Sequence, residues 1–516
     1  MAVYGIDLGT TYSSIAYVDA TGRPSVVPNT EGDHATPSAV YFEAADKVIV
    51  GTAAAQTAVV EPELVVDLIK RAMGKHETLV MHGRRFTPEE ISALILRRLM
   101  ADVEALTGET PTDAVITVPA YFGTPERLAT MQAGQIAGLN VIDVLSEPIA
   151  AALSYGALNA SSERAILVYD LGGGTFDTTV LRIAEDGDIH EISTKGHPAL
   201  GGVEWDERLA EYVVDRFMEE HPGVPHPFSD PTTVQDIRSR VEEAKRHLSE
   251  AEEYTLRLVH AGEVSAVTIT RAKFEEITRD LLDTTIEITM AVLAEARERD
   301  VDHIDQILLV GGSSRMPAVA ARLTEVLGQE PILHDPDLAV AKGAALHALE
   351  ETYRRLVSLG QPAEAQSLAR FCGLSPEQEL YIANRSIHRV AGRGFGVLCH
   401  DAVANRYHVM PLIKSDDLLP ASATRTFYSS YDSQKEIGIQ IMEQVGESDD
   451  PADHRLVAAA TLPLPPDSPA GTAVDVTFQV STAGALEIEG IPLQTGALSA
   501  EEVEAARDYV ANMRIA

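Results

Sequence analysis

The chain has 516 residues, 45% of them hydrophobic, which indicates a globular protein with at least two domains. Acidic side chains outnumber basic ones by 78 to 41, and the formal net charge of -37 repels phosphate backbones and anionic membrane surfaces, so we expect no nucleic-acid partner. Two cysteines are too few for a disulfide framework, Asp7 interrupts any signal-peptide core, and no run of eighteen apolar residues occurs, so we expect a cytoplasmic protein without membrane insertion.

The first predicted strand ends at Asp7 in "YGIDLGTTYSSIAYV", and a longer version of the same pattern, "VYDLGGGTFDTTVL", ends its strand at Asp170. In both, glycines follow the aspartate, then a threonine (Thr10 or Thr175) and a return strand. We expect the glycines to give the turns positive φ and to bring backbone amides close to an anion, while the carboxylate holds Mg²⁺ through water. Two such loops facing each other would clamp one triphosphate.

Either loop alone could be a tight β-hairpin with glycine at its corner. Repetition of the whole pattern favours the phosphate loops instead. A dinucleotide-binding fingerprint fits less well, because the second turn leads into the alternating residues 179–183 of a strand and not into a helix.

Further along the chain, "VQDIRSRVEEAKRHLSE" (234–250) predicts a helix with one apolar stripe and a separate polar stripe of Glu242, Lys245, Arg246 and Ser249. Alone, such a polar stripe is typical of a solvated helix face. A third glycine turn follows in "QILLVGGSSRMPAVAARLTEVLG" (306–328), this time between a strand and a helix. This junction can hold a nucleoside, with Arg315 either stacked on a flat ring or exposed to solvent.

These motifs resemble the 70-kDa heat-shock (DnaK-like) chaperone family. The resemblance rests, in family order, on "GIDLGTTYS" (5–13), "VITVPAYF" (115–122), "SEPIAAALSYG" (146–156), "YDLGGGTFD" (169–177), "ALGGVEWD" (199–206), "EEAKRHLS" (242–249) and "VGGSSRMP" (310–317). It implies an α/β ATPase domain over residues 1–350 with the two-lobed fold of actin and hexokinase, a duplicated ribonuclease-H-like fold. The implied cofactors are ATP or ADP and Mg²⁺, with K⁺ as a further candidate ion.

Residue by residue, the resemblance implies that Asp7 and Asp170 hold Mg²⁺ through water, that Lys70 orients the attacking water, that Glu147 coordinates this water or accepts its proton, and that Thr175 lies near the γ-phosphate. Positioning and charge neutralisation are what phosphoryl transfer demands. The residues implied to bind the nucleotide are Gly9, Thr10, Thr11, Tyr12, Gly172, Gly173, Gly174, Gly201, Gly202, Glu242, Lys245, Arg246, Ser249, Gly311, Gly312, Ser313, Arg315 and Asp337. Pro119 and Arg127 match the family's switch between domains, although a proline before an aromatic residue can simply end a strand.

After a helix-prone connector (351–388), short stretches of alternating polarity predict an antiparallel β-sandwich over residues 389–494. Two of them, "FYSSYDSQKEIGIQI" (427–441) and "VSTAGALEIEGI" (480–491), resemble the family's polypeptide-binding domain. The resemblance implies that Ile437 lines a pocket for an apolar client side chain and that Ser430 lies near the arch over the bound backbone. Periodicity alone instead favours Ile437, Ile439 and Ile441 as core residues.

Three departures from the family pattern stand out. Residues 495–516 predict one short helix, capped by Ser499 and Glu502, as a remnant of the family's long lid, so we expect fast peptide exchange. The connector lacks the usual acidic run of leucines, and the region after Gly74 is short.

The sequence therefore predicts a lidless ATP-driven chaperone that binds extended apolar polypeptides. The resemblance implies a J-domain co-chaperone and a nucleotide exchange factor as partners. The alternatives are a nucleotide-switched scaffold for one dedicated partner and a small-molecule kinase of the same superfold.

Overall fold

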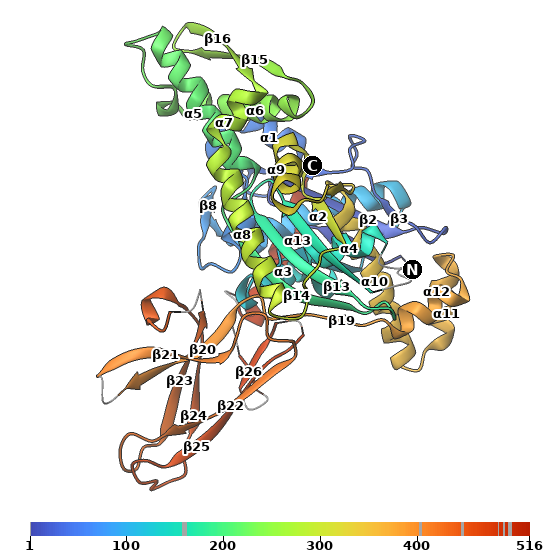
Figure 1. Cartoon of the computed structure of the whole chain (residues 1–516), viewed down its shortest axis with the longest axis vertical. Helices are drawn as coiled ribbons and strands as arrows, with labels where there is room; N and C mark the ends of the chain where they lie inside the picture. Colours follow the sequence, from blue (N-terminus) through green and yellow to red (C-terminus); the bar gives the residue numbers. More distant parts are fainter. Residues whose placement is uncertain are drawn as a thin grey trace.

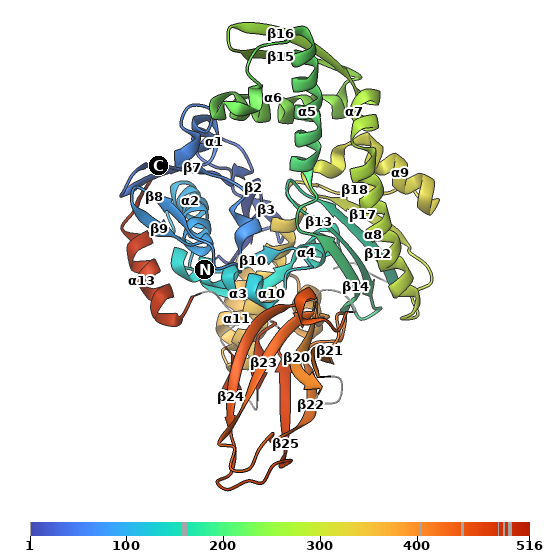
Figure 2. The same ribbon diagram turned by 90° about the vertical axis from the view of Figure 1, so that its left-hand side faces the viewer.

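The computed structural model describes residues 2–156, 163–401, 405–444, 448–482, 484–488, 491–493 and 498–516. Two six-stranded sheets form the centre of its α/β part (Figures 1 and 2). We call the part built on the first sheet the first lobe and the part built on the second sheet the second lobe. No helix among the described residues is long and apolar enough to cross a membrane.

The two sheets repeat one topology. The first has the order β11-β10-β1-β2-β3, with β4 paired to β2, and the second has the order β18-β17-β12-β13-β14-β19. The strands of the first are β1 (Tyr4–Asp7), β2 (Tyr12–Val18), β3 (Pro24–Val26), β4 (Thr36–Pro37), β10 (Asp113–Val118) and β11 (Asn140–Ser146). Those of the second are β12 (Arg164–Leu171), β13 (Phe176–Ile183), β14 (Ile189–His197), β17 (Gln306–Val310), β18 (Ile332–Leu333) and β19 (Ile387–His388).

Strand directions match as well. In each sheet the first three strands in sequence are antiparallel neighbours; β10 and β11 then run parallel to β1, as β17 and β18 run parallel to β12. This repeat is consistent with the duplicated, actin-like architecture expected from the two glycine loops, and each loop joins the first two strands of its sheet.

Two helices fill the space between the sheets. Helix α4 (Glu147–Tyr155) follows the last strand of the first repeat, and α10 (Ala339–Ser358) follows the last strand of the second. Their alanine-rich faces share one hydrophobic core with both sheets. The approach is close: a Cβ at Gly343 would lie 1.7 Å from the carbonyl oxygen of Ala150. The two lobes are therefore joined by helices packed backbone to backbone.

The other helices that precede α11 lie outside this central core. On the first lobe these are α2 (Pro88–Thr107) and α3 (Thr124–Ala137), beside a small sheet of β5 (Val40–Ala44), β6 (Lys47–Val50) and β7 (Val65–Val66) with helix α1 (Thr52–Thr57) and the hairpin β8 (Leu79–Met81) and β9 (Arg84–Phe86). On the second lobe they are α5 (Gly202–Glu220), α6 (Pro231–Glu250), α7 (Arg271–Ile277), α8 (Arg279–Arg297) and α9 (Pro317–Leu327), with the hairpin β15 (Glu253–His260) and β16 (Glu263–Thr270). The helix predicted over 234–250 is the greater part of α6.

The region after α10 differs from a plain linker. Helices α11 (Pro362–Phe371) and α12 (Pro376–Asn384) pack into the core shared by α4 and α10 through residues such as Leu368 and Ile382. Strand β19 then joins the edge of the second sheet beside β14.

A β-domain of two antiparallel sheets follows and projects from one end of the molecule, opposite α5, α6, β15 and β16 (Figures 1 and 2). One sheet has the order β21-β20-β23-β24 and the other β22-β25-β26-β27, and their inward residues form one hydrophobic core. The strands are β20 (Gly394–Asp401), β21 (Arg406–Ile413), β22 (Ala421–Tyr428), β23 (Glu436–Gln444), β24 (Arg455–Pro463), β25 (Ala473–Val480), β26 (Leu486–Ile488) and β27 (Ile491–Pro492).

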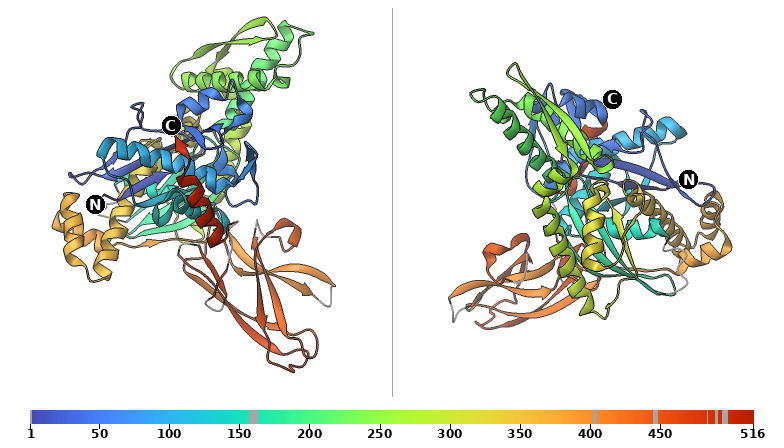
Figure 3. Two further views of the ribbon diagram at one scale, coloured as in Figure 1. Left: turned by 180° about the vertical axis from the view of Figure 1, so that it is seen from behind. Right: turned by 45° about the horizontal axis from the view of Figure 1, so that its top comes forward.

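Helix α13 (Ala500–Ala511) lies on the first lobe, beside α2 and α3 (Figures 2 and 3). Val510 and Met513 are buried in the core of that lobe, and β28 (Arg514–Ile515) extends the small sheet by pairing in parallel with β6. This position differs from that expected of a lid remnant over the β-domain. The physical reason is the apolar face of α13, which is covered by the first lobe and extends its core.

Candidate functional site

The two glycine loops face each other across the gap between the lobes. A Cβ at Gly173 would lie 2.1 Å from Thr11 Oγ1, and one at Gly174 would lie 2.3 Å from Thr10 Cγ2. None of the glycines 9, 172, 173 and 174 has a positive φ, so the expectation of left-handed turns is wrong. At Gly173 and Gly174 the opposing threonines leave no room for a side chain, and at Gly9 a Cβ would lie 1.9 Å from the carbonyl oxygen of Tyr12.

Helix α5 orients the second loop. The amides of Gly202 and Val203 donate to the carbonyl oxygens of Gly172 (3.0 Å) and Gly173 (2.8 Å). Because a trans peptide places N–H and C=O on opposite sides, the amides of Gly173 and Gly174 point away from α5. Gly201 packs its Cα against the backbone of this loop, where a Cβ would lie 2.6 Å from Gly174. The loop therefore has its donors free to face a ligand on the side away from α5.

Behind the loops lies a buried cluster of acids around one lysine. Lys70 Nζ contacts Glu147 Oε1 at 2.6 Å, and both side chains are less than a tenth exposed. Burial opposes the charge of Lys70, but Glu147 and Asp7 outweigh it and raise the lysine's pKa, so Lys70 is charged at neutral pH. Glu147 is held at this position as the first residue of α4.

Three aspartates complete this acidic cluster. Burial, followed by the charge of Glu147, raises the pKa of Asp7 to about 7, while Lys70 and a hydrogen bond from Thr117 act in the opposite direction. The same two causes raise the pKa of Asp170 well above its ordinary value. They also raise that of Asp177, which lies opposite Asp170 in the β12–β13 register.

Four carboxylates therefore share one neighbouring ammonium group in a buried space. This excess of negative charge fits a divalent cation, because oxygen ligands are those that Mg²⁺ prefers and the cation would relieve the mutual repulsion. Asp7 and Asp170, the two residues expected to hold Mg²⁺, both belong to this cluster. Asp177 is an additional acid of the same cluster.

The expected nucleoside residues come from α6 and the turn after β17. Lys245 is buried, donates to Gly202 O (2.8 Å) and pairs with Asp206 at 2.6 Å. Burial raises the pKa of Asp206 to about 6, although Lys245 counteracts it. Ser249 donates to Lys245 O. Ser313 packs closely against Gly202, since a Cβ added to that glycine would lie 2.5 Å from Ser313 Oγ. These residues are brought together at the amino end of α5.

Arg315 pairs with Asp337 at 2.5 Å across an exposed surface. A Cβ at Gly312 would lie 3.1 Å from Asp337, and Gly311 has a φ of 80° and packs its Cα against Asp170 Oδ1. The strand-turn-helix junction thus joins the nucleoside side of the site to the acidic cluster.

Two arginines reach across the gap between the lobes. Arg246 of α6 donates to the Tyr12 hydroxyl at 2.8 Å and to Glu242 at 2.6 Å. Arg71, which follows Lys70, donates to Gly174 O at 2.6 Å and to Glu204 of α5 at 2.8 Å. Side chains from both lobes therefore close over the loops.

A comparison with protein families agrees with this geometry. The model of the family described as Hsp70 protein matches residues 3–82 and 77–349, more than half of the chain. The chain belongs to the Hsp70 family. The matched region contains both glycine loops, Lys70, Glu147 and the nucleoside side of the site, and it ends within α10, ahead of the connector and the β-domain.

In this Hsp70 chain the two expected switch residues lie where the first lobe meets the β-domain. Arg127 donates to the carbonyl oxygens of Phe122 (3.1 Å) and Val144 (3.4 Å), and burial lowers the pKa of its guanidinium. Pro119 is buried at the end of β10, and its carbonyl oxygen accepts from the amide of Phe122 at 3.1 Å. Thr124, three residues before Arg127, donates to Gly484 O of the β-domain at 2.6 Å.

Buried ion pairs hold the β-domain and connector against the α/β part. Arg389 pairs with Asp143 through both guanidinium nitrogens, and His347 contacts the same carboxylate at 2.8 Å. Burial opposes the charge of Asp143, but Arg389 and His347 outweigh it and keep the aspartate's pKa well below its ordinary value. Glu126 of α3 pairs with Arg455 of β24 at 2.9 Å, so the first lobe is tied directly to the β-domain.

The two residues expected to bind peptide lie in different surroundings. Ile437 is 8% exposed and belongs to the β-domain core together with Ile439 and Ile441, as periodicity alone favours. Ser430 is exposed in the turn between β22 and β23, where its amide donates to Gln434 Oε1 at 2.7 Å. The tyrosines on either side of Ser430, Tyr428 and Tyr431, are 63% and 61% exposed.

Sequence reasoning missed three functional candidates. Asp177 ends the "YDLGGGTFD" motif, but it lies in the alternating pattern of a strand, which is typical of an ordinary strand residue. The strand register shows that it lies opposite Asp170. Arg71 adjoins Lys70, and only its contact with Glu204 across the gap reveals its position. Arg389 directly follows the connector, and its partner Asp143 is 246 residues away in the sequence, so no local pattern marks the pair.

Proposed function

We propose that this Hsp70-family chain is an ATPase that hydrolyses ATP to ADP and phosphate between its two lobes and uses the bound nucleotide to control its β-domain. The observation that carries this proposal is the acidic cluster with its single lysine, placed directly behind two facing glycine loops. Bound Mg²⁺ would neutralise charge on the phosphate oxygens. The chain's own residues would do the positioning.

Each residue has a role that follows from its place. The amides of Gly173 and Gly174 and the hydroxyls of Thr10 and Thr11 would hold the phosphates. Charged Lys70 would orient the attacking water beside Glu147, which it contacts at 2.6 Å. Thr175, the last loop residue before β13, would donate to the transferred phosphoryl group. Preorganised donors of this kind stabilise charge that develops in the transition state.

The ATPase proposal is tested with Thr175→Ala. Single-turnover phosphate release should slow while ATP binding is retained, because one hydroxyl is lost from the loop and the acidic cluster is kept. Thr255→Ala, on the exposed hairpin β15, is the matched control and should leave both measurements unchanged. Equal rates for Thr175→Ala and the unaltered chain would remove Thr175 from the mechanism. Transfer of phosphate to a metabolite instead of water would favour the kinase alternative.

We further propose that the β-domain binds extended apolar polypeptide, with Tyr428 and Tyr431 beside Ser430 supplying apolar surface. Aromatic side chains contribute large contact areas, and the sheet-edge strands β22 and β24 offer backbone groups to an extended chain. Because Ile437 belongs to the core, Ile437→Asp would perturb the whole domain. Tyr431→Ser is the sharper change because the side chain is already exposed.

The experiment measures the dissociation rate of a fluorescent apolar peptide with ADP and then with ATP. Faster release in ATP, and weaker binding by Tyr431→Ser than by a Tyr407→Ser control on β21, would support a chaperone that exchanges clients rapidly. Binding that ignores nucleotide would indicate uncoupled domains, and absence of binding would favour the scaffold for one dedicated partner. A J-domain protein and an exchange factor would be tested by their effect on phosphate release and ADP release, and a cytoplasmic location by fractionation.

A further inference from the structure

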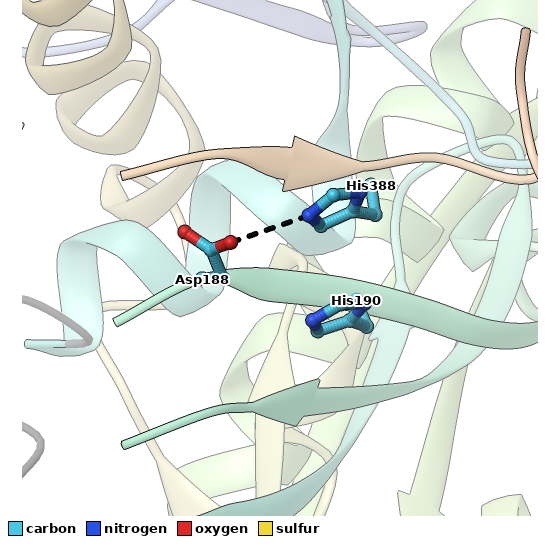
Figure 4. A group of neighbouring side chains, drawn as sticks. All are labelled: Asp188, His190 and His388. Atoms are coloured by element: carbon cyan, nitrogen blue, oxygen red, sulfur yellow. Dashed lines mark hydrogen bonds and ion pairs between the residues drawn. The ribbon is translucent and has the colours of Figure 1, made fainter. Parts of the chain in front are cut away.

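The connector strand β19 brings a histidine to the edge of the second lobe. Strand β19 pairs in parallel with the start of β14, so His388 lies directly opposite His190. Asp188 stands two residues before His190, at the same end of the strand pair (Figure 4). Three potential metal ligands from two separate parts of the chain therefore meet at one point.

The geometry of these side chains is defined. The rings of His190 and His388 are stacked, with centroids 4.3 Å apart and planes within 7° of parallel. Asp188 Oδ2 contacts His388 Nε2 at 3.3 Å, while Asp188 Oδ1 accepts from the amide of Ser386 at 2.6 Å. One ligand atom from each of the three residues lies within 4.8 Å of the other two. Figure 4 shows a nitrogen of each ring on the side that faces Asp188.

The donor set selects the kind of ion. Two imidazoles and one carboxylate are the ligands of many zinc sites that keep a further position open for water, whereas Mg²⁺ and Ca²⁺ prefer oxygen ligands alone. Nitrogens bound to one tetrahedral zinc lie roughly 3.4 Å apart, given bonds of about 2.0–2.1 Å. Because the stacked rings direct their nitrogen lone pairs nearly parallel, both rings must rotate about their side-chain bonds before the lone pairs converge on one ion.

Exposure and support at this cluster also suit an exchangeable ion. The side chains of His388 and Asp188 are 35% and 21% exposed, so an ion and its water ligand can enter from solvent. The bond from the Ser386 amide orients the carboxylate, as outer-shell partners of metal ligands do. Among the residues that the structure describes, this is the one group of three histidine, cysteine or acidic residues whose ligand atoms converge in this way.

We propose that Asp188, His190 and His388 form a binding site for a divalent transition-metal ion of the zinc class, which fastens the connector strand β19 to the edge strand β14. The strand pair has a register of only two residues, Ile189 with Ile387 and His190 with His388. A metal bound across it makes release of β19 depend on breaking metal–ligand bonds. The site lies apart from the acidic cluster of the proposed ATPase site, so the inference stands without that proposal.

The first test measures metal binding by the full chain without nucleotide. Excess Mg²⁺ is present to occupy the acidic cluster, so that Zn²⁺ binding at that cluster does not contribute to the signal. Zn²⁺ is titrated against a chromophoric chelator, and Co²⁺ is used as a spectroscopic probe of its ligands. His388→Gln, His190→Gln and Asp188→Asn should each weaken Zn²⁺ binding at least about tenfold, since even outer-shell partners contribute 10- to 100-fold to metal affinity. His303→Gln, whose side chain is 82% exposed, is the matched control and should bind as the unaltered chain does.

The second test follows hydrogen exchange of residues 386–391. One equivalent of Zn²⁺ should slow exchange there in the unaltered chain and in His303→Gln, and should have no such effect in the three site variants. Equal melting temperatures without metal would show that these variants fold. Zn²⁺ affinity that the site substitutions leave unchanged, or a bound ion that does not slow exchange of the connector, would overturn the proposal.

Discussion

Replacing Arg389 by glutamine should release the connector from the first lobe. Arg389 and Asp143 are 10% and 16% exposed and pair through both guanidinium nitrogens. Removing one partner of a buried ion pair costs about 3–5 kcal/mol, because the other charge is left buried without compensation. His347 contacts the same carboxylate at 2.8 Å and can still donate to it, so we expect a cost of about 3 kcal/mol, the lower end of this range.

This loss of stability should appear as a larger equilibrium constant for local opening of the segment around Arg389. The amide of Val390 donates to Glu191 Oε2 of the second lobe at 3.2 Å, so its hydrogen exchange reports on openings in which this segment leaves both lobes, and such openings also require the Arg389–Asp143 pair to break. A loss of about 3 kcal/mol corresponds to exchange faster by roughly two orders of magnitude, since each 1.4 kcal/mol is tenfold. Exchange of residues 387–391 is measured by mass spectrometry at a pH where the free amide rate is known.

The matched control is Arg406→Gln. Arg406 forms an ion pair with Asp449 at 2.7 Å, but both side chains are 54% exposed, and such pairs contribute about 0.2–1 kcal/mol at most. The double variant Asp143→Asn/Arg389→Gln should recover part of the protection, because no buried charge is left alone. The reasoning is refuted if Arg389→Gln, shown to be folded by its melting curve, changes exchange at Val390 no more than Arg406→Gln does.

Three further predictions concern the acidic cluster, the β-domain interface and α13. Lys70→Met should slow single-turnover hydrolysis by roughly 10²-fold or more, whereas Lys75→Met at an exposed position should leave the rate unchanged. Equal hydrolysis rates for Lys70→Met and the unaltered chain would exclude Lys70 from the reaction. Burial and then the charges of Glu295 and Glu191 raise the pKa of Asp416 to about 7, although Arg299 opposes this shift. Ionisation of Asp416 therefore lowers the stability of the fold increasingly between about pH 4 and pH 7. Asp416→Asn should therefore raise the melting temperature at pH 8 more than at pH 5, and a gain independent of pH would contradict this. Val510→Asp, at a fully buried position of α13, should lower the melting temperature of the first lobe by several degrees. Ala505→Asp, on the exposed face of the same helix, should leave it nearly unchanged, and melting curves of the two variants measured by fluorimetry test this difference.

Much of the fold could be predicted from local sequence patterns. The alternation after Asp170 and the spacing of Ile237, Val241 and Leu248 predict a strand and a helix, and the structure has β13 and α6 at these places. These patterns succeed because one face of each element is buried in a nearby core, and that face sets the period. The two glycine loops were recognisable for the same reason, since each follows a buried strand.

Other features depend on contacts that no local pattern records. The burial of Lys245 within a polar stripe follows from its partners Asp206 and Gly202, which lie some forty residues earlier. The place of α13 is set by the core of a lobe formed from the first part of the chain, so an amphipathic helix was predictable but its partner was not. The glycines of the loops indicated a tight backbone, but only the facing threonines show that space, and not φ, is the reason at Gly173 and Gly174.

The two attachments of the β-domain have a mechanical consequence. The chain enters this domain from β19 on the second lobe and returns to the first lobe at α13 and β28, and Arg455 of the domain pairs with Glu126 of the first lobe, so the domain is joined to both lobes. A rotation of one lobe against the other changes the separation of these two anchors. The β-domain must then deform, turn about its attachments or detach at one of them. It therefore acts in parallel with the packed helices α4 and α10, and its stiffness adds to the free energy that any movement of one lobe against the other requires.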